Sequence, residues 1–289
     1  DLHLSIRRQR QMCIRDRTMS NGVYGLLGVN GAGKTTLMRM LCTLIKPTSG
    51  SILCDGKDIF ALDGEYRRIL GYLPQEFGFY PEFSVHDYLM YIASIKGMRI
   101  SIARKRVTEL LRQVGLAKMQ NRKMKKLSGG MKRRAGIAQA MLNNPKILIL
   151  DEPTAGLDPN ERIRFRNLIS ELSQDRLVLL STHIVSDIEY IANQVLLMKD
   201  GKISHSGTQE EIIQSVPVKV WSCVVANNEV EMWQKQFKVS NMKTLSDGIE
   251  LRILSEKSPH YNAKEETMTL EDIFLYYFGE KTGDDYDVL

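Results

Sequence analysis

Short runs of consecutive apolar residues alternate with stretches of helical character through much of this chain. Apolar runs occupy residues 23–27, 147–150 and 177–180, and a further apolar segment ends in Pro74-Gln75. Runs of this length and uniformity are typical of strands that are buried on both faces of a parallel sheet. Residues 36–41 follow the first run without a helix breaker and predict a helix. Residues 18–80 and 128–215 therefore predict a doubly wound α/β core.

A helical segment is predicted between the two parts of this core. Residues 102–111 have apolar positions at helical spacing, and Ser84-Val85-His86-Asp87 resembles a capping box at a helix start. No long apolar run interrupts the segment. We expect a helical subdomain over about residues 81–127.

The pattern changes beyond residue 216. Residues 218–221 alternate like a strand, and Asp247-Gly248 is a hairpin signal between the strand-like residues 242–245 and 249–253. Thr269 then opens a short amphipathic helix that ends near Gly279. Residues 216–289 predict a small α+β appendage, with packing or dimer contact as its simplest role.

Composition and charge narrow the class of protein. The chain has 289 residues, of which 43% are hydrophobic and 26% are charged, as in ordinary globular proteins. Its apolar runs are too short to cross a bilayer, which takes about 20 residues. The net charge is +6, but residues 1–17 alone hold five arginines against two aspartates. No aromatic residues accompany the basic cluster at residues 122–134, so we expect no nucleic-acid partner.

Candidate chemistry begins with a glycine-rich loop. Residues 28–35, GVNGAGKT, match the pattern GxxxxGK followed by Ser or Thr between the first predicted strand and helix. The glycines let backbone N–H groups converge on phosphate oxygens at a helix N-terminus. Lys34 can reach the β- and γ-phosphates, and the Thr35 hydroxyl can bind Mg²⁺. The predicted nucleotide-binding residues of this segment are Gly28, Asn30, Gly31, Ala32, Gly33, Lys34, Thr35 and Thr36.

Polar residues also follow the other predicted strands. Asp151-Glu152 ends the run at 147–150, and His183 follows the run at 177–180. The carboxyl ends of parallel strands form the ligand-binding edge of such a sheet. One carboxylate can hold Mg²⁺ while its neighbour polarises a water molecule. Gln75 lies at the end of another apolar segment and joins this set.

A second anion site is predicted at residues 127–131, LSGGM. Ser128 is a natural N-cap for the helix that follows, and Gly129 and Gly130 expose backbone donors. This turn lies more than a dozen residues before Asp151.

Together these motifs resemble the ATP-binding cassette (ABC) transporter family. Six segments occur in that family's order: GVNGAGKT, YLPQ, LSGGM, ILILDEP, AGLD and STH. The resemblance covers roughly residues 18–215 and implies a P-loop NTPase cassette with a RecA-like core, an inserted helical subdomain and the C-terminal appendage. LSGGMKRR with a C-terminal extension is most similar to ABC-2-type exporters.

The resemblance implies an ATPase that works as a head-to-tail dimer, either a homodimer or a pair of cassettes. Lys34, Thr35 and Thr36 would hold ATP and Mg²⁺ in one chain, while Ser128, Gly129 and Gly130 would meet the γ-phosphate from the other. It further implies that Glu152 is the general base and that His183 contacts the γ-phosphate. Asp158 would lie at the dimer seam, and Thr35, Gln75 and Asp151 would surround Mg²⁺.

The resemblance also implies a partner and a location. The ATPase would energise a multi-spanning membrane permease from the cytoplasmic face of the cell membrane, and the implied direction of transport is export. Tyr88 and Tyr91 are then expected in the core or at the membrane partner. The alternative is a soluble ABC ATPase of DNA repair or translation. Residues 75–128 are too short for the coiled coil of the repair type. Proteins of the translation type carry two cassettes in tandem, whereas this chain has one set of motifs, so transport is favoured.

The first 17 residues do not fit this pattern. The family places a strand pair there, with an aromatic residue that stacks on adenine. The segment SIRRQRQMCIRDRTMS has no aromatic residue and little strand alternation. MCIRDR also resembles translated sequencing-adapter text. We therefore predict that residues 1–17 replaced the natural beginning or diverged from it, and assign no adenine-stacking residue.

Overall fold

The computed structural model describes residues 2–6 and 14–279 of the chain. Contacts divide it into two compact units, with the division between Ser206 and Gly207. The sequence pattern placed a boundary slightly later, at residue 216. The residues between these two positions contain helix α9 (Gln209–Ser215), which contacts the last helix of the second unit.

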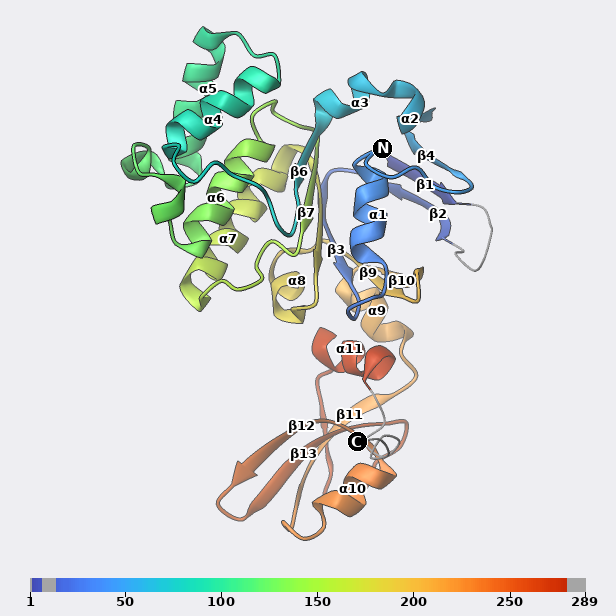
Figure 1. Ribbon diagram of the computed structural model, residues 1–289. Helices are drawn as coiled ribbons and strands as arrows, with labels where there is room; N and C mark the ends of the chain where they lie inside the picture. The colour runs from blue at the N-terminus through green and yellow to red at the C-terminus, as the bar shows by residue number, and fades with distance from the viewer. Residues whose placement is uncertain (1, 7–13, 280–289) are drawn as a thin grey trace, which may run out of the picture. The chain divides into compact units, whose positions relative to one another are not determined.

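The first unit contains a six-stranded sheet in the order β10-β9-β3-β8-β7-β6 (Figure 1). The strands from β9 to β6 pair in parallel. Every residue of β7 and β8 is buried, which explains their unbroken apolar runs in the sequence. The strands of this sheet are β3 (Gly22–Leu27), β6 (Leu70–Leu73), β7 (Ile147–Asp151), β8 (Leu177–Thr182), β9 (Gln194–Lys199) and β10 (Lys202–Gly207).

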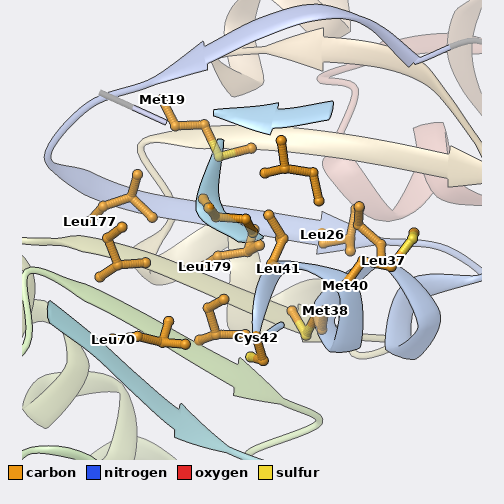
Figure 2. Close-up of a cluster of buried hydrophobic side chains, with 14 of the residues drawn as sticks. Met19, Leu26, Leu37, Met38, Met40, Leu41, Cys42, Leu70, Leu177 and Leu179 are labelled. Carbon is orange, nitrogen blue, oxygen red and sulfur yellow. The ribbon is translucent and has the colours of Figure 1, made fainter. Parts of the chain in front are cut away.

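Helix α1 (Lys34–Leu41) packs against this sheet (Figure 2). Leu37, Met38 and Leu41 are almost completely buried in one cluster with Leu26 and Leu179. Full burial of each such side chain contributes about 1.5–3 kcal/mol. This packing fixes the N-terminus of α1 next to the end of β3.

A second sheet of the first unit has the order β2-β1-β4-β5 and is antiparallel. Its strands are β1 (Leu2–Ile6), β2 (Ile14–Met19), β4 (Ser51–Cys54) and β5 (Lys57–Asp58). A strand pair therefore precedes β3, although the sequence pattern of this segment did not predict one. The weak alternation of residues 5–20 hid this pair, but Leu2–Ile6 alternates apolar and polar residues, and β1 pairs with both β2 and the distant β4. The suggestion that residues 1–17 are foreign to the natural chain stays a prediction.

Three helices occupy the segment between β6 and β7: α4 (Val85–Ile95), α5 (Ile100–Gln113) and α6 (Gly129–Ala140) (Figure 1). Ser84 caps α4 by accepting a hydrogen bond from the backbone N–H of Asp87, as its sequence predicted. Tyr88 is 1% exposed and belongs to the core, whereas Tyr91 is 37% exposed. The remaining helical elements of this unit are α2 (Ile59–Leu62), α3 (Gly64–Ile69), α7 (Pro159–Leu172), α8 (Val185–Ile191) and the 3-10 turns η1 (Ala117–Met119), η2 (Met124–Lys126) and η3 (Ser173–Asp175).

The second unit is a four-stranded antiparallel sheet in the order β12-β13-β11-β14, with helices. The predicted hairpin is confirmed, because Leu245 pairs with Gly248. The predicted last helix is also confirmed, and Thr269 and Asp272 form its capping box. The elements that follow α9 are β11 (Lys219–Val225), α10 (Val230–Gln236), β12 (Lys238–Leu245), β13 (Gly248–Ser255), β14 (Lys264–Glu266) and α11 (Leu270–Phe278).

Candidate functional site

The loop at residues 28–35 connects β3 to α1, and its backbone surrounds the side chain of Lys34. Gly31 and Gly33 have φ angles of 83° and 100°, a backbone region that favours glycine. The Lys34 ammonium is inside the loop and donates hydrogen bonds to the carbonyl oxygens of Gly28 (2.7 Å) and Val29 (3.1 Å). Burial lowers the pKa of Lys34, while Glu152 and Asp151 raise it. The loop thus holds a desolvated positive charge at the N-terminus of α1.

The predicted acid pair lies beside this loop. Asp151 ends β7 and is 1% exposed. Its Oδ1 atom accepts hydrogen bonds from Ser181 Oγ (2.6 Å) and from Thr35 Oγ1 (3.4 Å). The parallel register explains the first contact, because Asp151 is directly opposite Ser181 on β8. Asp151 is therefore fixed against the hydroxyl that the sequence predicted to bind Mg²⁺.

Glu152 is held between the loop lysine and the histidine after β8. Its Oε2 atom is 2.9 Å from Nδ1 of His183, and its Oε1 atom is 3.9 Å from Nζ of Lys34. The Glu152 backbone N–H donates to the Ser181 hydroxyl at 3.0 Å. Its φ of 46° is a left-handed value for a non-glycine residue, a strain that folded proteins keep mostly at functional sites. The carboxylate is 8% exposed and the histidine side chain is 50% exposed.

Lys34, Thr35, Glu152 and His183 all line one cleft of about 430 Å³. A cleft of this size can take a small-molecule ligand. All of its lining residues were predicted from the sequence, although the elements that carry them are far apart along the chain. They are Asn30, Gly31, Gly33, Lys34, Thr35, Thr36, Gln75, Glu152 and His183.

The remaining predicted residues do not line this cleft. Gly28, Ala32 and Asp151 support its walls from the loop and from β7. Ser128 caps α6 by accepting from the Met131 N–H at 3.3 Å, and Asp158 caps α7. Ser128, Gly129 and Asp158 are exposed, but Gly130 is buried. The predicted role of both glycines as backbone donors to an anion stays a prediction.

Ser181 is a site residue that was not predicted from the sequence. Its hydroxyl accepts a hydrogen bond from the backbone of Glu152 and donates one to Asp151, so it orients both acids. The available signal was its place in the STH motif. If the apolar runs at 147–150 and 177–180 are assumed to pair as parallel strands, Ser181 lies beside Asp151 and Glu152.

Comparisons with known proteins identify the family of this chain. The sequence pattern of the family described as ABC transporter matches residues 17–155. An uncharacterized ABC transporter ATP-binding protein of Bacillus subtilis (strain 168), YxlF, is 39% identical over 216 residues, which is 75% of this chain and 71% of that protein. The chain belongs to the family of ABC transporter ATP-binding proteins. Another family member, the bacitracin transport ATP-binding protein BcrA of Bacillus licheniformis, is 42% identical over 63% of this chain and 59% of its own length.

Solved ABC structures confirm the predicted cassette fold. The structure of cbiO1 from Clostridium perfringens, part of the ABC transporter complex cbiONQ, aligns with a TM-score of 0.66 and 27% identity. It covers 74% of this chain and 90% of that one. This ABC chain is accordingly an ATP-binding and ATP-hydrolysing subunit of a transporter. In residues 2–6 and 14–279, no helix has the length and hydrophobicity needed to span a membrane.

We expect this ABC subunit to discriminate poorly between ATP and GTP. None of the residues that line the cleft is aromatic apart from His183, and residues 1–19 contain no Phe, Tyr or Trp. An aromatic–base stack contributes about 1–3 kcal/mol, by analogy with nucleic-acid binding. Its absence corresponds to a loss of about one to two decades in affinity. Phosphate contacts remain, so both nucleotides bind.

Titration with ATP and GTP measures this. The comparison protein replaces residues 1–17 with a strand pair that carries a tyrosine, and it should bind ATP about tenfold more tightly than the present chain. Equal ATP affinities of the two proteins would show that the tyrosine does not stack on the base. A strong ATP preference in the present chain would show that adenine is recognised in another way.

Proposed function

We propose that two copies of the chain, or this chain and a second cassette, close head-to-tail around two ATP molecules. Each ATP then lies between the phosphate loop of one chain and the turn Leu127–Met131 of the other. One observation supports this above all: Ser128 and Gly129 are exposed and do not line the cleft of their own chain. The N-terminus of α6 nevertheless offers free backbone N–H groups, which suit an anion. The γ-phosphate of ATP on a partner satisfies them.

The donor set fits Mg²⁺. Oδ2 of Asp151 is buried and has no hydrogen-bond partner among the described residues. A buried carboxylate oxygen without a partner is costly unless a cation or water reaches it. Thr35 Oγ1 is next to the same carboxylate, and Gln75 lines the same cleft. We assign Mg²⁺ to Asp151, Thr35 and Gln75, where it would neutralise charge on the β- and γ-phosphates.

Glu152 is proposed as the general base. Its carboxylate accepts a proton from the attacking water, and His183 holds it in place through the 2.9 Å contact. The His183 ring is half exposed at the cleft, so its other nitrogen can reach the γ-phosphate. Lys34 donates to loop carbonyls in this structure. Phosphate oxygens replace those carbonyl groups as its acceptors when ATP binds.

We propose that the membrane partner of this ATPase is a multi-spanning permease and that the ATPase binds it from the cytoplasmic side. An aromatic cluster on the helical segment supports a docking surface for it. The Tyr80 ring stacks on Phe83 with centroids 5.1 Å apart, and the Tyr91 ring packs edge-on against both. Tyr80 is 49% exposed, and Ile95, further along α4, is 65% exposed. Rigid aromatic residues of this kind dominate protein interfaces.

Export is the proposed direction of transport. Relatives of this chain carry the names bacitracin transport, linearmycin resistance and Nod factor export ATP-binding protein. These names state the transport roles of the relatives, and they support the proposal of export for this chain.

The permease proposal predicts that Tyr91→Ala weakens attachment to the membrane partner without loss of nucleotide binding. Truncating an aromatic hot spot typically costs about 2 kcal/mol or more, which is roughly a 30-fold loss of affinity. The measurement is co-isolation of the chain with its permease from detergent-solubilised membranes. Tyr190→Ala is the matched control, because Tyr190 is 76% exposed on α8, away from this cluster. Equal recovery of the two variants would contradict docking at Tyr91.

A further inference from the structure

The two glycines of the turn Leu127–Met131 have different surroundings. A side-chain carbon added to Gly129 would meet nothing within 4 Å. The same carbon on Gly130 would be 2.5 Å from Oε2 and 2.7 Å from Cγ of Glu161. Gly130 is thus small because a side chain of its own molecule packs on it, and Gly129 is the glycine whose surface is open to a partner.

Glu161 also forms a largely buried ion pair with Arg134, which lies on the helix that follows the turn. Its Oε2 atom is 3.2 Å from Nε of Arg134 on α6, and its Oε1 atom accepts from Nη2 of the same arginine at 3.4 Å. The two side chains are 14% and 12% exposed, so water screens the pair less than a surface pair. Arg134 Nη1 also donates to the carbonyl oxygens of Val114 (3.0 Å) and Gly115 (3.3 Å). The arginine therefore has a fixed orientation when it meets Glu161.

The backbone of Glu161 belongs to a different functional segment. Its N–H donates to Oδ1 of Asp158 at 2.9 Å, and this contact caps α7. Asp158 is the last residue of the segment Ala155–Asp158. Glu161 thus contacts the Leu127–Met131 turn through its side chain and the Ala155–Asp158 segment through its main chain. Its second ion pair, to Arg164, is on the exposed side of α7.

We propose that Glu161 is a positioning residue that keeps the Leu127–Met131 turn and the Ala155–Asp158 segment of one chain in a fixed relation. Both segments then reach the partner's nucleotide together when the dimer closes. The inference rests on the proposed head-to-tail dimer and extends it, because it names the contact that makes the two segments one rigid surface. Removing the charge of Glu161 frees the turn without touching the phosphate loop.

ATP-driven dimer formation tests this role. In a Glu152→Gln background, which slows hydrolysis, light scattering gives the ATP concentration at half-maximal dimer. Glu161→Gln keeps the side-chain shape and should raise that concentration about tenfold, a loss between those of surface and buried charge pairs. ADP affinity, which reports the phosphate loop alone, should change less than about twofold. Glu171→Gln is the matched control, since it removes the same charge from an exposed position on the same helix and should change neither value.

Further variants separate positioning from general stability. Arg134→Gln should raise the ATP concentration by a similar factor, and the double variant should lose little more than either single one, because the two residues act as one pair. Unchanged dimer formation in Glu161→Gln overturns the inference. A fall in ADP affinity that parallels a lower melting temperature also overturns it, because the residue would then be merely structural. Ser128→Arg is measured alongside: normal ATP-driven dimers in that variant would refute the proposed dimer itself, whatever Glu161→Gln does.

Discussion

Glu152→Gln is expected to slow ATP hydrolysis by about 10²–10⁴-fold, the usual cost of losing a general base. ATP should still bind, because binding depends on Lys34 and the loop around it. Glutamine has the shape of glutamate and can still contact His183, so the cleft should keep its form. The substitution removes only the proton-accepting carboxylate, which is 2.9 Å from the ring of His183.

Single-turnover hydrolysis, with ATP binding measured in parallel, provides the test. Lys34→Ala should show the opposite pattern and lose binding, since the lysine is the main positive charge of the loop. Glu171→Gln serves as the control for loss of one negative charge on an exposed helix position. Turnover of Glu152→Gln close to that of the unaltered chain would remove Glu152 from the role of base.

Ser128→Arg is expected to abolish hydrolysis by a chain tested alone while its own loop still binds nucleotide. The arginine would fill the space where a partner's γ-phosphate meets the turn. Loss of the N-cap hydrogen bond to Met131 costs only about 1 kcal/mol, too little to unfold the unit. Ser84→Arg is the control, because Ser84 caps α4 in the same way but is not in the turn.

Mixing two inactive chains gives the decisive form of this experiment. A dimer of Ser128→Arg with Lys34→Ala has one doubly altered site and one site with an intact loop and an intact turn. Hydrolysis by the mixture, absent from each chain alone, is the expected result. Full activity of Ser128→Arg by itself would end the proposal that the turn acts on a partner.

Much of the candidate cleft could be predicted from the sequence because its groups follow buried strands directly. Asp151-Glu152 and His183 each come at the end of an unbroken apolar run. Parallel strands bring such ends to one edge, and the observed register does so by placing Leu150 opposite Leu180. The phosphate loop could also be predicted from the sequence, because its residues are contiguous. Its chemistry needs consecutive backbone N–H groups, which a short contiguous segment supplies by itself.

Contacts between segments that are distant in sequence were decided only by the tertiary structure. Strand β1 pairs on one side with β2 and on the other with β4, which is distant in sequence and which no local pattern identifies as its neighbour. The contact of the Glu161 side chain with Gly130 also depends on the tertiary structure. Packing brings α7 onto α6, and no local sequence pattern predicts that contact. The sequence by itself determined the strands, the loop and the chemistry at the strand ends, because each depends on neighbouring residues and on burial. Only the folded chain determined which turn packs against which helix, because that depends on shape and charge meeting across the molecule.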